Sequence, residues 1–496
     1  MSSITDIEPK KVFKFFNEIS QIPRPSYHEE AISDYVFNFA KDRKLEVHQD
    51  KYHNVIIIKE ASEGYEKAEP VILQGHMDMV CEKEPGCTKD MDTEGLDLQL
   101  DGDILSAKGT TLGADNGIAV AMMLALLDDE ELKHPRIECV FTTAEEVGMD
   151  GAREIDLSIL RGRRLLNLDS ECEGELLASC AGGGRADIRL PLRRERARAG
   201  VRLLVAVTGL TGGHSGDEIN KGRANATILL NHVLIRLWKE AEASIIAIEG
   251  GSKDNAIPRE ARALVAIPRS KETVAYNLIS DLSKEYKDIY RIPDPNLSLK
   301  GSIIKDKKSL EKEDLPDDAM KWLPVTRTDT HRITTLIAAL PNGVMRMSDS
   351  IPDLVETSLN LGITNMSQAD LTLGYSLRSS VDASYDHLKL EVELIAKGLG
   401  ADVSFHGEYP AWQFTPQSDF RELMCSTYKK LFNKDMKVSA IHAGLECGII
   451  SSKVEGIDAV SIGPDMWDVH TPNERLSVSS VARTYDYIKN ILSETK

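Results

Sequence analysis

The sequence lacks the features of a membrane-spanning, secreted or disulfide-stabilised protein. Its longest apolar run, residues 118–127, is shorter than the roughly 18 residues that a membrane helix needs. The first residues contain no apolar core of a secretory signal, so we expect a cytoplasmic protein. The 7 cysteines are an odd number without a C-x-x-C pair, which predicts reduced thiols rather than a disulfide framework.

Positive charge is also in short supply. The chain carries 60 Lys and Arg against 79 Asp and Glu, a formal net charge of −19. Nucleic acids and anionic membranes would repel such a surface, so we expect neither as a partner. The excess of acidic residues does not by itself indicate which reaction the protein catalyses.

Several sequence motifs of well-known enzyme classes are missing. There is no G-x-S-x-G nucleophile elbow between a strand and a helix, no phosphate-binding P-loop and no H-E-x-x-H helix. The glycines at 182–184 do not form the G-x-G-x-x-G fingerprint of a dinucleotide-binding fold. Serine hydrolases, P-loop enzymes and one large class of zinc proteases are therefore disfavoured.

The composition that remains is that of a soluble globular chain, and its length is sufficient for two or three domains. It has 496 residues, of which 42% are apolar and 28% charged. Its first third alternates between strand and helix patterns, which predicts a mainly parallel sheet with helices on both faces. A capping box formed by Ser26 and Glu29 predicts a further helix start. The predicted strands are 54–58, 71–73, 137–141 and 165–168, and the most apolar predicted helix is 117–127.

After residues 182–184 the pattern changes to α+β, and the α/β pattern returns near residue 401. We therefore expect a first domain of residues 1–184 and 399–496 that is interrupted by an insert, residues 185–398. A charge-dense segment, 305–319, is expected at the surface. The insert contains two similar sets of elements, which leaves an internal duplication open; the second set is predicted as strands 335–340, 357–363 and 370–378 with a helix through 388–397.

His76 and Asp78 follow a predicted strand two residues apart, so their side chains project to the same side. A neutral imidazole is a good Zn²⁺ ligand, and a nearby carboxylate can orient it through its other ring nitrogen. An ordinary histidine at a strand end is the commoner meaning of such a pair.

Asp115 lies at the end of a glycine-rich loop, where a helix is predicted to begin. An aspartate there often only caps the helix, but it could also bridge two metal ions. Glu145 and Glu146 follow a strand predicted to be buried, which places them at the rim of a cleft rather than on a solvated face. One of them can then bind a metal while its neighbour transfers a proton.

Asp169 again follows a predicted strand, and His470 lies in a loop beside Pro472. Each of these signals is weak alone. Together, three consecutive strands end in a histidine or a carboxylate, at the edge where open α/β sheets form their sites. A set of histidines and carboxylates without cysteine favours a catalytic dinuclear centre over a structural zinc site.

The order H-x-D, G-x-D-N-G, T-A-E-E, N-L-D and H-T-P-N-E resembles the dinuclear metallopeptidases related to glutamate carboxypeptidase, aminoacylase and the cytosolic dipeptidases, and the cytosolic dipeptidases match best. The resemblance covers essentially the whole chain. It implies a phosphorylase/hydrolase-like α/β catalytic domain with a mainly parallel sheet flanked by helices, interrupted by an inserted α+β lid domain. It also implies two Zn²⁺ ions per chain, with Mn²⁺ or Co²⁺ as alternatives.

The resemblance assigns a role to each of the motif residues. Asp78 would orient His76, and Glu145 would be the general base. The metal ligands would be His76 and Asp169 for one ion, Glu146 and His470 for the other, and Asp115 as the bridge between them.

The resemblance also gives His214 a catalytic role and places three residues in substrate binding. His214 would approach the scissile carbonyl, Asn255 and Gly444 would contact substrate, and Arg378 would hold its terminal carboxylate. A structural role stays open for each, since a histidine in a glycine-rich turn is often structural and a strand arginine usually forms a salt bridge.

These features predict a metallo-dipeptidase for dipeptides with free termini, including Xaa-His substrates such as β-Ala-His. The alternatives are a carboxypeptidase or an N-acyl amino-acid deacylase of the same family, or a non-catalytic peptide-binding protein, which should have lost ligands or the base. The length of the insert favours the dipeptidases. The sequence leaves open a monomer or a homodimer, and whether His214 serves its own chain or a partner.

Overall fold

The computed structural model describes residues 4–196, 200–305, 315–316 and 318–495. Contacts divide the chain into two compact units. Within the described residues, no helix is long and apolar enough to cross a membrane. Unit 1 comprises Met1–Cys180, Trp412–Ile441 and Leu445–Lys496, and unit 2 comprises Ala181–Ala411 and His442–Gly444.

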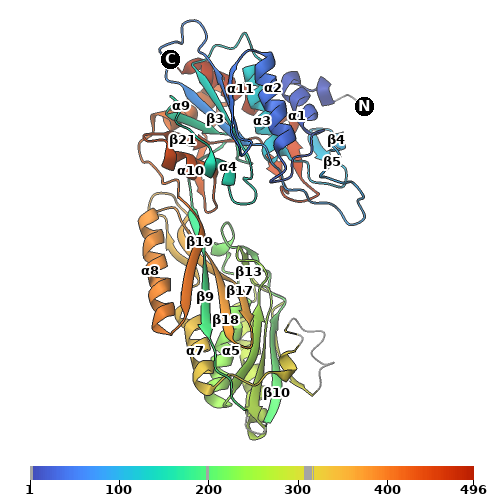
Figure 1. Ribbon diagram of the computed structural model, residues 1–496, viewed down its shortest axis with the longest axis vertical. Coiled ribbons are helices and arrows are strands. Elements are labelled where there is room, and N and C mark those ends of the chain that lie inside the picture. Colours follow the sequence, from blue (N-terminus) through green and yellow to red (C-terminus); the bar gives the residue numbers. More distant parts are fainter. Residues whose placement is uncertain (1–3, 197–199, 306–314, 317, 496) are drawn as a thin grey trace. The chain divides into compact units, whose positions relative to one another are not determined.

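Unit 1 is built around a mixed eight-stranded sheet in the order β1-β2-β6-β3-β7-β21-β8-β20 (Figure 1). The central strands β6, β3, β7 and β21 run parallel to their neighbours within this group. Every residue of β3 and β6 is buried, as expected of parallel strands covered on both faces. The strands are β1 Glu46–Gln49, β2 Val55–Lys59, β3 Val71–His76, β6 Ile137–Thr142, β7 Arg164–Asn167, β8 Glu175–Cys180, β20 Lys437–Ile441 and β21 Asp458–Ser461.

Helices cover both faces of this sheet. In β2, Val55 and Ile57 join one apolar cluster, while Ile56 and Ile58 join another on the opposite face. The first face packs against α1 Lys10–Ile19, α2 Glu30–Asp42, α3 Ala114–Leu127, α9 Asp419–Phe432 and α11 Val478–Glu494; the second packs against α10 Glu446–Lys453 and the segment after α4 Asp150–Glu154.

A second, four-stranded sheet of unit 1 has the order β22-β23-β5-β4. It joins two parts of the chain that are far apart in sequence, because β23 pairs with β5. The strands are β4 Leu98–Asp101, β5 Ile104–Ala107, β22 Met466–Trp467 and β23 Arg475–Ser477. The loop that follows β5 and the loop between β22 and β23 are therefore held close to each other.

Unit 2 contains a nine-stranded antiparallel sheet with helices packed on one face. After its initial glycines, strand β9 alternates between buried and exposed residues, which is the pattern of a sheet with one solvated face. Helix α8 runs alongside β19, β9 and β18 (Figure 1). The elements are β9 Gly182–Pro191, β10 Gly200–Thr208, β12 Ser244–Gly250, β14 Ala261–Pro268, β15 Ser298–Ile304, β16 Gly343–Met347, β17 Val355–Met366, β18 Asp370–Ser379, β19 Asp402–Tyr409, α5 Ala226–Glu240, α6 Glu272–Ile289, α7 Arg327–Ala339 and α8 Asp382–Gly398.

The two sets of elements seen in the insert form one continuous sheet, in which β12 pairs with β17 at Gly250 and Thr364. Strand β19 pairs with β9, so unit 2 extends to Ala411, beyond the boundary expected at residue 398. Of the charge-dense segment 305–319, residues 306–314 and 317 lie outside the described residues.

Two local predictions were wrong. Residues 335–340 do not form a strand: residues 335–339 are the end of α7 and Leu340 follows it. The helix begins where the Thr326 hydroxyl accepts a hydrogen bond from the Asp329 N–H at 3.0 Å. Ser26 and Glu29 do not form a capping box. The Ser26 hydroxyl donates to Asp78, and the Glu29 carboxylate accepts from the Ala144 N–H, because tertiary partners compete with the local motif.

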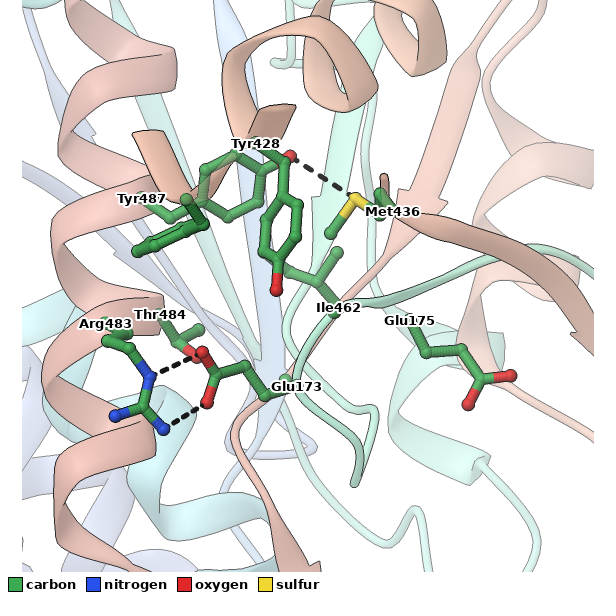
Figure 2. A pocket seen from close by; sticks show the side chains of 11 residues that line it. Glu173, Glu175, Tyr428, Met436, Ile462, Arg483, Thr484 and Tyr487 are labelled. Atoms are coloured by element: carbon green, nitrogen blue, oxygen red, sulfur yellow. Dashed lines mark hydrogen bonds and ion pairs between the residues drawn. The ribbon is translucent and has the colours of Figure 1, made fainter. Parts of the chain in front are cut away.

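The loop after β7 is tied to α11 by a bidentate ion pair. Arg483 donates from Nε and Nη2 to the two oxygens of Glu173, both at 2.6 Å. Figure 2 shows this pair beside Tyr428 in a small pocket that none of the predicted site residues lines. A planar guanidinium matched to a carboxylate in this way restrains the backbone that follows Asp169.

Close packing of β3 against α3 makes Gly75 sensitive to substitution. A Cβ at this position would collide with the Asn116 side-chain oxygen and lie 3.0 Å from the Ala119 Cβ. We expect Gly75→Ala to lower the free energy of unfolding by about 1–3 kcal/mol, the usual cost of overpacking. In a thermal unfolding experiment Gly398→Ala is the control, because a Cβ there meets no atom within 4 Å. Equal midpoints for both variants would contradict this packing.

Candidate metal centre

The five predicted metal ligands come together in unit 1 from five separate segments. His76 is the last residue of β3, Glu146 follows β6 and Asp169 follows β7, so three ligands lie at the carboxyl ends of neighbouring parallel strands. Asp115 lies in the first turn of α3, and His470 lies in the loop between β22 and β23.

Asp115 divides its two carboxylate oxygens between two groups. Its Oδ1 lies 3.2 Å from the His76 Nε2, and that nitrogen lies 3.5 Å from the Asp169 Oδ1. Its Oδ2 lies 3.0 Å from the His470 Nε2, which is also 3.0 Å from the Glu146 Oε2. The arrangement has two halves that share one carboxylate.

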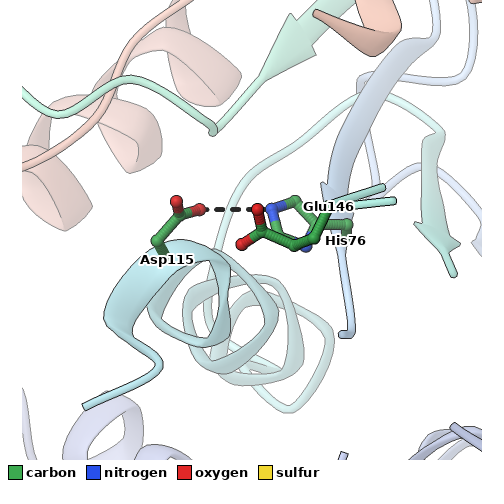
Figure 3. A group of neighbouring side chains, drawn as sticks. All are labelled: His76, Asp115 and Glu146. Atoms are coloured by element: carbon green, nitrogen blue, oxygen red, sulfur yellow. Dashed lines mark hydrogen bonds and ion pairs between the residues drawn. The ribbon is translucent and has the colours of Figure 1, made fainter. Parts of the chain in front are cut away.

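The donor set fits metal ions. One ligand atom each from His76, Asp115 and Glu146 lies within 4.8 Å of the others, a group that draws on both halves (Figure 3). The Glu146 Oε1 is buried and has no hydrogen-bond partner among the described residues, so it is an acceptor without a donor. Imidazoles and carboxylates without cysteine are the ligands expected of a catalytic Zn²⁺ site.

The pKa shifts in the cluster show that its carboxylates outnumber the imidazoles that could neutralise them. Burial alone would lower the pKa of His76, but Asp169 and Asp115 raise it well above its usual value. Hydrogen bonds to Asp115 and Glu146 raise the pKa of His470 to about 11. Burial raises the pKa of Glu145, Glu146 and Asp169. Several carboxylates thus compete for two imidazoles, a balance that bound cations would relieve.

A single buried side chain, Asp78, supports several members of this cluster. Its Oδ1 lies 3.3 Å from the His76 Nδ1 and accepts the Glu145 N–H at 3.1 Å. Its Oδ2 accepts the Glu146 N–H at 3.2 Å and the Ser26 hydroxyl at 2.8 Å. Asp78 therefore holds both the imidazole at the end of β3 and the backbone that follows β6.

The catalytic candidate His214 and the three residues predicted to bind substrate all belong to unit 2, including Gly444, whose loop was expected in the α/β domain. In the two-stranded pair of β11, Gly213–His214, and β13, Ala256–Ile257, His214 lies opposite Ala256 and therefore beside Asn255. The Asn255 residue is exposed, and Gly444 lies in the short segment of unit 2 that precedes α10.

Arg378 lies on β18 and is 8% exposed. Its Nη1 donates to the Tyr409 hydroxyl at 3.1 Å, while its Nε has no hydrogen-bond partner among the described residues. Burial and then the charge of Arg378 lower the pKa of His214, and they lower the pKa of His442 to about 3. A buried guanidinium with a free donor, flanked by neutral imidazoles, is suited to an anion.

The sequence model of peptidase family M20/M25/M40 matches residues 72–494. The chain belongs to this family. The predicted resemblance to the metallopeptidases and the mixed α/β fold class are thereby confirmed.

Two relatives resemble this metallopeptidase over its whole length. The cytosol non-specific dipeptidase of Escherichia coli is 36% identical over 100% of this chain and 99% of its own. The crystal structure of aminoacylhistidine dipeptidase from Vibrio alginolyticus superposes with a TM-score of 0.89 at 33% identity, covering 100% of this chain and 98% of that one. An aminopeptidase PepT structure from Bacillus cereus, at 17% identity and a TM-score of 0.55, shares the fold.

The structure of this metallopeptidase also shows supporting residues to which the sequence had assigned no role. The Asn116 side chain accepts the His76 N–H at 3.2 Å and donates to the Leu168 carbonyl at 2.8 Å, so it joins the ends of β3 and β7. Glu446 accepts hydrogen bonds from Gln74 at 2.5 Å and from the Thr142 hydroxyl at 2.6 Å. Asn116 occurs in the G-x-D-N-G motif quoted above, but only the tertiary contacts reveal what Asn116 and Glu446 hold.

Replacing Asp78 should weaken metal binding without removing a ligand. We expect Asp78→Asn to lower Zn²⁺ affinity about 10- to 100-fold, since the amide loses the charge opposite His76 and one acceptor of the loop N–H groups. Competition with a chromophoric chelator measures this. Ser26→Ala, which removes only one hydrogen bond to Asp78, is the control and should change the affinity less than tenfold. Wild-type affinity in Asp78→Asn would show that the contact has no role.

Proposed function

We propose that this chain is a dinuclear metallo-dipeptidase that hydrolyses dipeptides with free termini, including Xaa-His substrates such as β-Ala-His. The single observation that carries the proposal is the Asp115 carboxylate, whose two oxygens face two separate sets of ligands. The full-length similarity to proteins named cytosol non-specific dipeptidase and aminoacylhistidine dipeptidase supports the substrate class and a cytoplasmic location.

We propose two Zn²⁺ ions, although Mn²⁺ and Co²⁺ suit the same donors. His76 and Asp169 would hold one ion, Glu146 and His470 would hold the other, and Asp115 would bridge them. Bound in this way, the metal ions would supply Lewis acidity to the peptide carbonyl and to the attacking water. The raised pKa values of Glu145, Glu146 and Asp169, which divalent cations would lower, support this assignment.

Glu145 is the proposed general base. Its carboxylate has no side-chain hydrogen bond to another described residue, whereas its neighbour Glu146 contacts His470. A carboxylate next to the ligand set that no other side chain engages can take a proton from the attacking water and deliver it to the leaving amine nitrogen. Asp78, which binds the Glu145 N–H, would keep this carboxylate in position.

Unit 2 would supply the groups that recognise substrate, acting as the lid. Arg378 has a free buried donor and a planar fork suited to the terminal carboxylate of a dipeptide. His214 would donate toward the oxygen that becomes negative during attack, with Asn255 and Gly444 as further contacts. A monomer and a homodimer both satisfy these roles.

A carboxypeptidase or an N-acyl amino-acid deacylase of the same family would use the same catalytic residues. These activities differ from a dipeptidase in what they require at the amino terminus and in the length of the substrate. The names of both full-length relatives favour the dipeptidase. A panel of substrates therefore tests which of these three activities the chain has, while variants of the catalytic residues test the chemistry that they share.

Glu145→Gln should abolish proton transfer and spare metal binding. We expect two metal ions per chain in elemental analysis and a kcat for β-Ala-His about 10²- to 10⁴-fold lower, the usual contribution of a general base. Glu154→Gln, an exposed glutamate on α4, is the matched control and should behave as wild type. Near-normal turnover by Glu145→Gln would refute the assignment of this residue.

Arg378→Ala should remove recognition of the terminal carboxylate. For β-Ala-His we expect kcat/KM to fall about 10- to 100-fold, the value of a charged hydrogen bond, while the amide of the same dipeptide is cleaved equally slowly by both enzymes. Arg189→Ala, which removes an exposed arginine paired with Asp370, is the control.

In the same assay, the wild type should prefer β-Ala-His to a tripeptide and to an N-acetyl amino acid; the reverse preference would favour the alternative activities.

A further inference from the structure

Glu474 is a buried carboxylate that the mechanism above does not use. It is 2% exposed, and both of its oxygens are fully engaged with backbone N–H groups. The Oε2 accepts from Leu112 at 2.7 Å and from Gly113 at 2.9 Å, and the Oε1 accepts from Ala114 at 2.8 Å and from Asp115 at 3.2 Å. One side chain thus gathers four consecutive N–H groups at the start of α3.

The position of Glu474 in the chain links two of the proposed ligands. It lies four residues after His470 and directly before β23, which pairs with β5 at Arg475 and Ser106. Its four partners end at Asp115, the residue proposed to bridge the metal ions. The Glu474 carboxylate therefore ties the loop that carries His470 to the loop that carries Asp115.

A second buried charge holds the same loop from another side. The Arg24 Nη2 donates to the Gly113 carbonyl at 2.6 Å, and Arg24 is 1% exposed. A Cβ at Gly113 would lie 2.6 Å from this nitrogen, and a Cβ at Gly117 would lie 2.5 Å from it. The backbone before α3 is thus fixed by Glu474 through its N–H groups and by Arg24 through a carbonyl.

We propose that Glu474 is a positioning residue of the dinuclear centre, which sets the spacing between Asp115 and His470 and thereby the affinity for the metal ion that these two share with Glu146. The inference rests on the proposed function, because it needs the two-metal centre. A merely structural glutamate would stabilise the fold and leave the affinity of the folded protein unchanged.

The test uses Glu474→Gln in the full-length protein, with Zn²⁺ as the probe. The amide keeps one acceptor oxygen, but its NH₂ group faces backbone N–H groups that it cannot bind. We expect one of the two Zn²⁺ ions to bind about 10- to 100-fold more weakly in chelator competition, as for other residues that orient ligands, and the other ion within threefold of wild type. Added Zn²⁺ should restore kcat for β-Ala-His with KM unchanged.

Glu138→Gln is the matched control. Glu138 is 0% exposed and accepts the N–H groups of Arg161 and Gly162 at 3.0 Å, but it lies near the amino end of β6, away from the strand end that leads to Glu146. This variant should lower the thermal midpoint without changing Zn²⁺ affinity. Unchanged Zn²⁺ affinity in Glu474→Gln would overturn the proposal and make Glu474 a structural residue like Glu138.

Two further outcomes are distinguishable. If the wild type itself binds fewer than two Zn²⁺ ions, the proposed function fails before Glu474 is tested. If Glu474→Gln does not fold by circular dichroism, Glu474→Asp keeps the charge and both acceptors but withdraws them by one methylene. A tenfold weaker Zn²⁺ affinity in Glu474→Asp supports the proposal, and a wild-type affinity or a failure to fold overturns it.

Discussion

The Asp115 carboxylate, shared between the imidazoles of His76 and His470, constrains the placement of everything around it in unit 1. Its two oxygens can serve both partners only if the end of β3, the start of α3 and the loop after β22 are held in fixed positions. No local sequence preference achieves this. The parallel sheet supplies the first element, and the pairing of β23 with β5 brings the third to the second.

Collecting buried carboxylates in one place is costly, because burial disfavours their charged forms. The fold holds the backbone of these segments with buried side-chain acceptors rather than with mobile water. Asp78 binds the backbone of Glu145 and Glu146, and Asn116 binds the backbone of His76. The raised pKa values of Glu145 and Asp169 show that the negative charge of the cluster is not balanced, which explains why the cluster suits divalent cations.

Unit 2 differs from unit 1 in the charge of its candidate residues. Its candidate residues include a buried guanidinium rather than a group of carboxylates, and the imidazoles of His214 and His442, which feel the charge of Arg378, have lowered rather than raised pKa values. Neutral imidazoles beside a buried cation leave the positive charge of Arg378 available to an anion. The two units therefore carry complementary chemistry: one attracts cations, and the other is suited to a carboxylate.

Much of the fold was predictable from local patterns. The short apolar runs of β3 and β7 and the largely apolar β6, which contains Glu138, identify these segments as buried strands through the hydrophobic effect. Residues 335–340 show the limit of that approach, since a short apolar run fits a strand or a helix equally well, and the cap at Thr326 decides for α7. Ser26 and Glu29 likewise satisfy a local motif but bind tertiary partners instead.

By itself, the sequence determined which residues are available as ligands and which strands deliver them, because both follow from residue type and hydrophobic periodicity. Only the tertiary structure decided how Asp115 divides its oxygens, and what Asn116, Glu446 and Glu474 hold. These contacts join positions up to 372 residues apart, and nothing in the sequence near one partner identifies the other. Contacts of that range depend on how the strands and loops pack, so they become visible only in the folded chain.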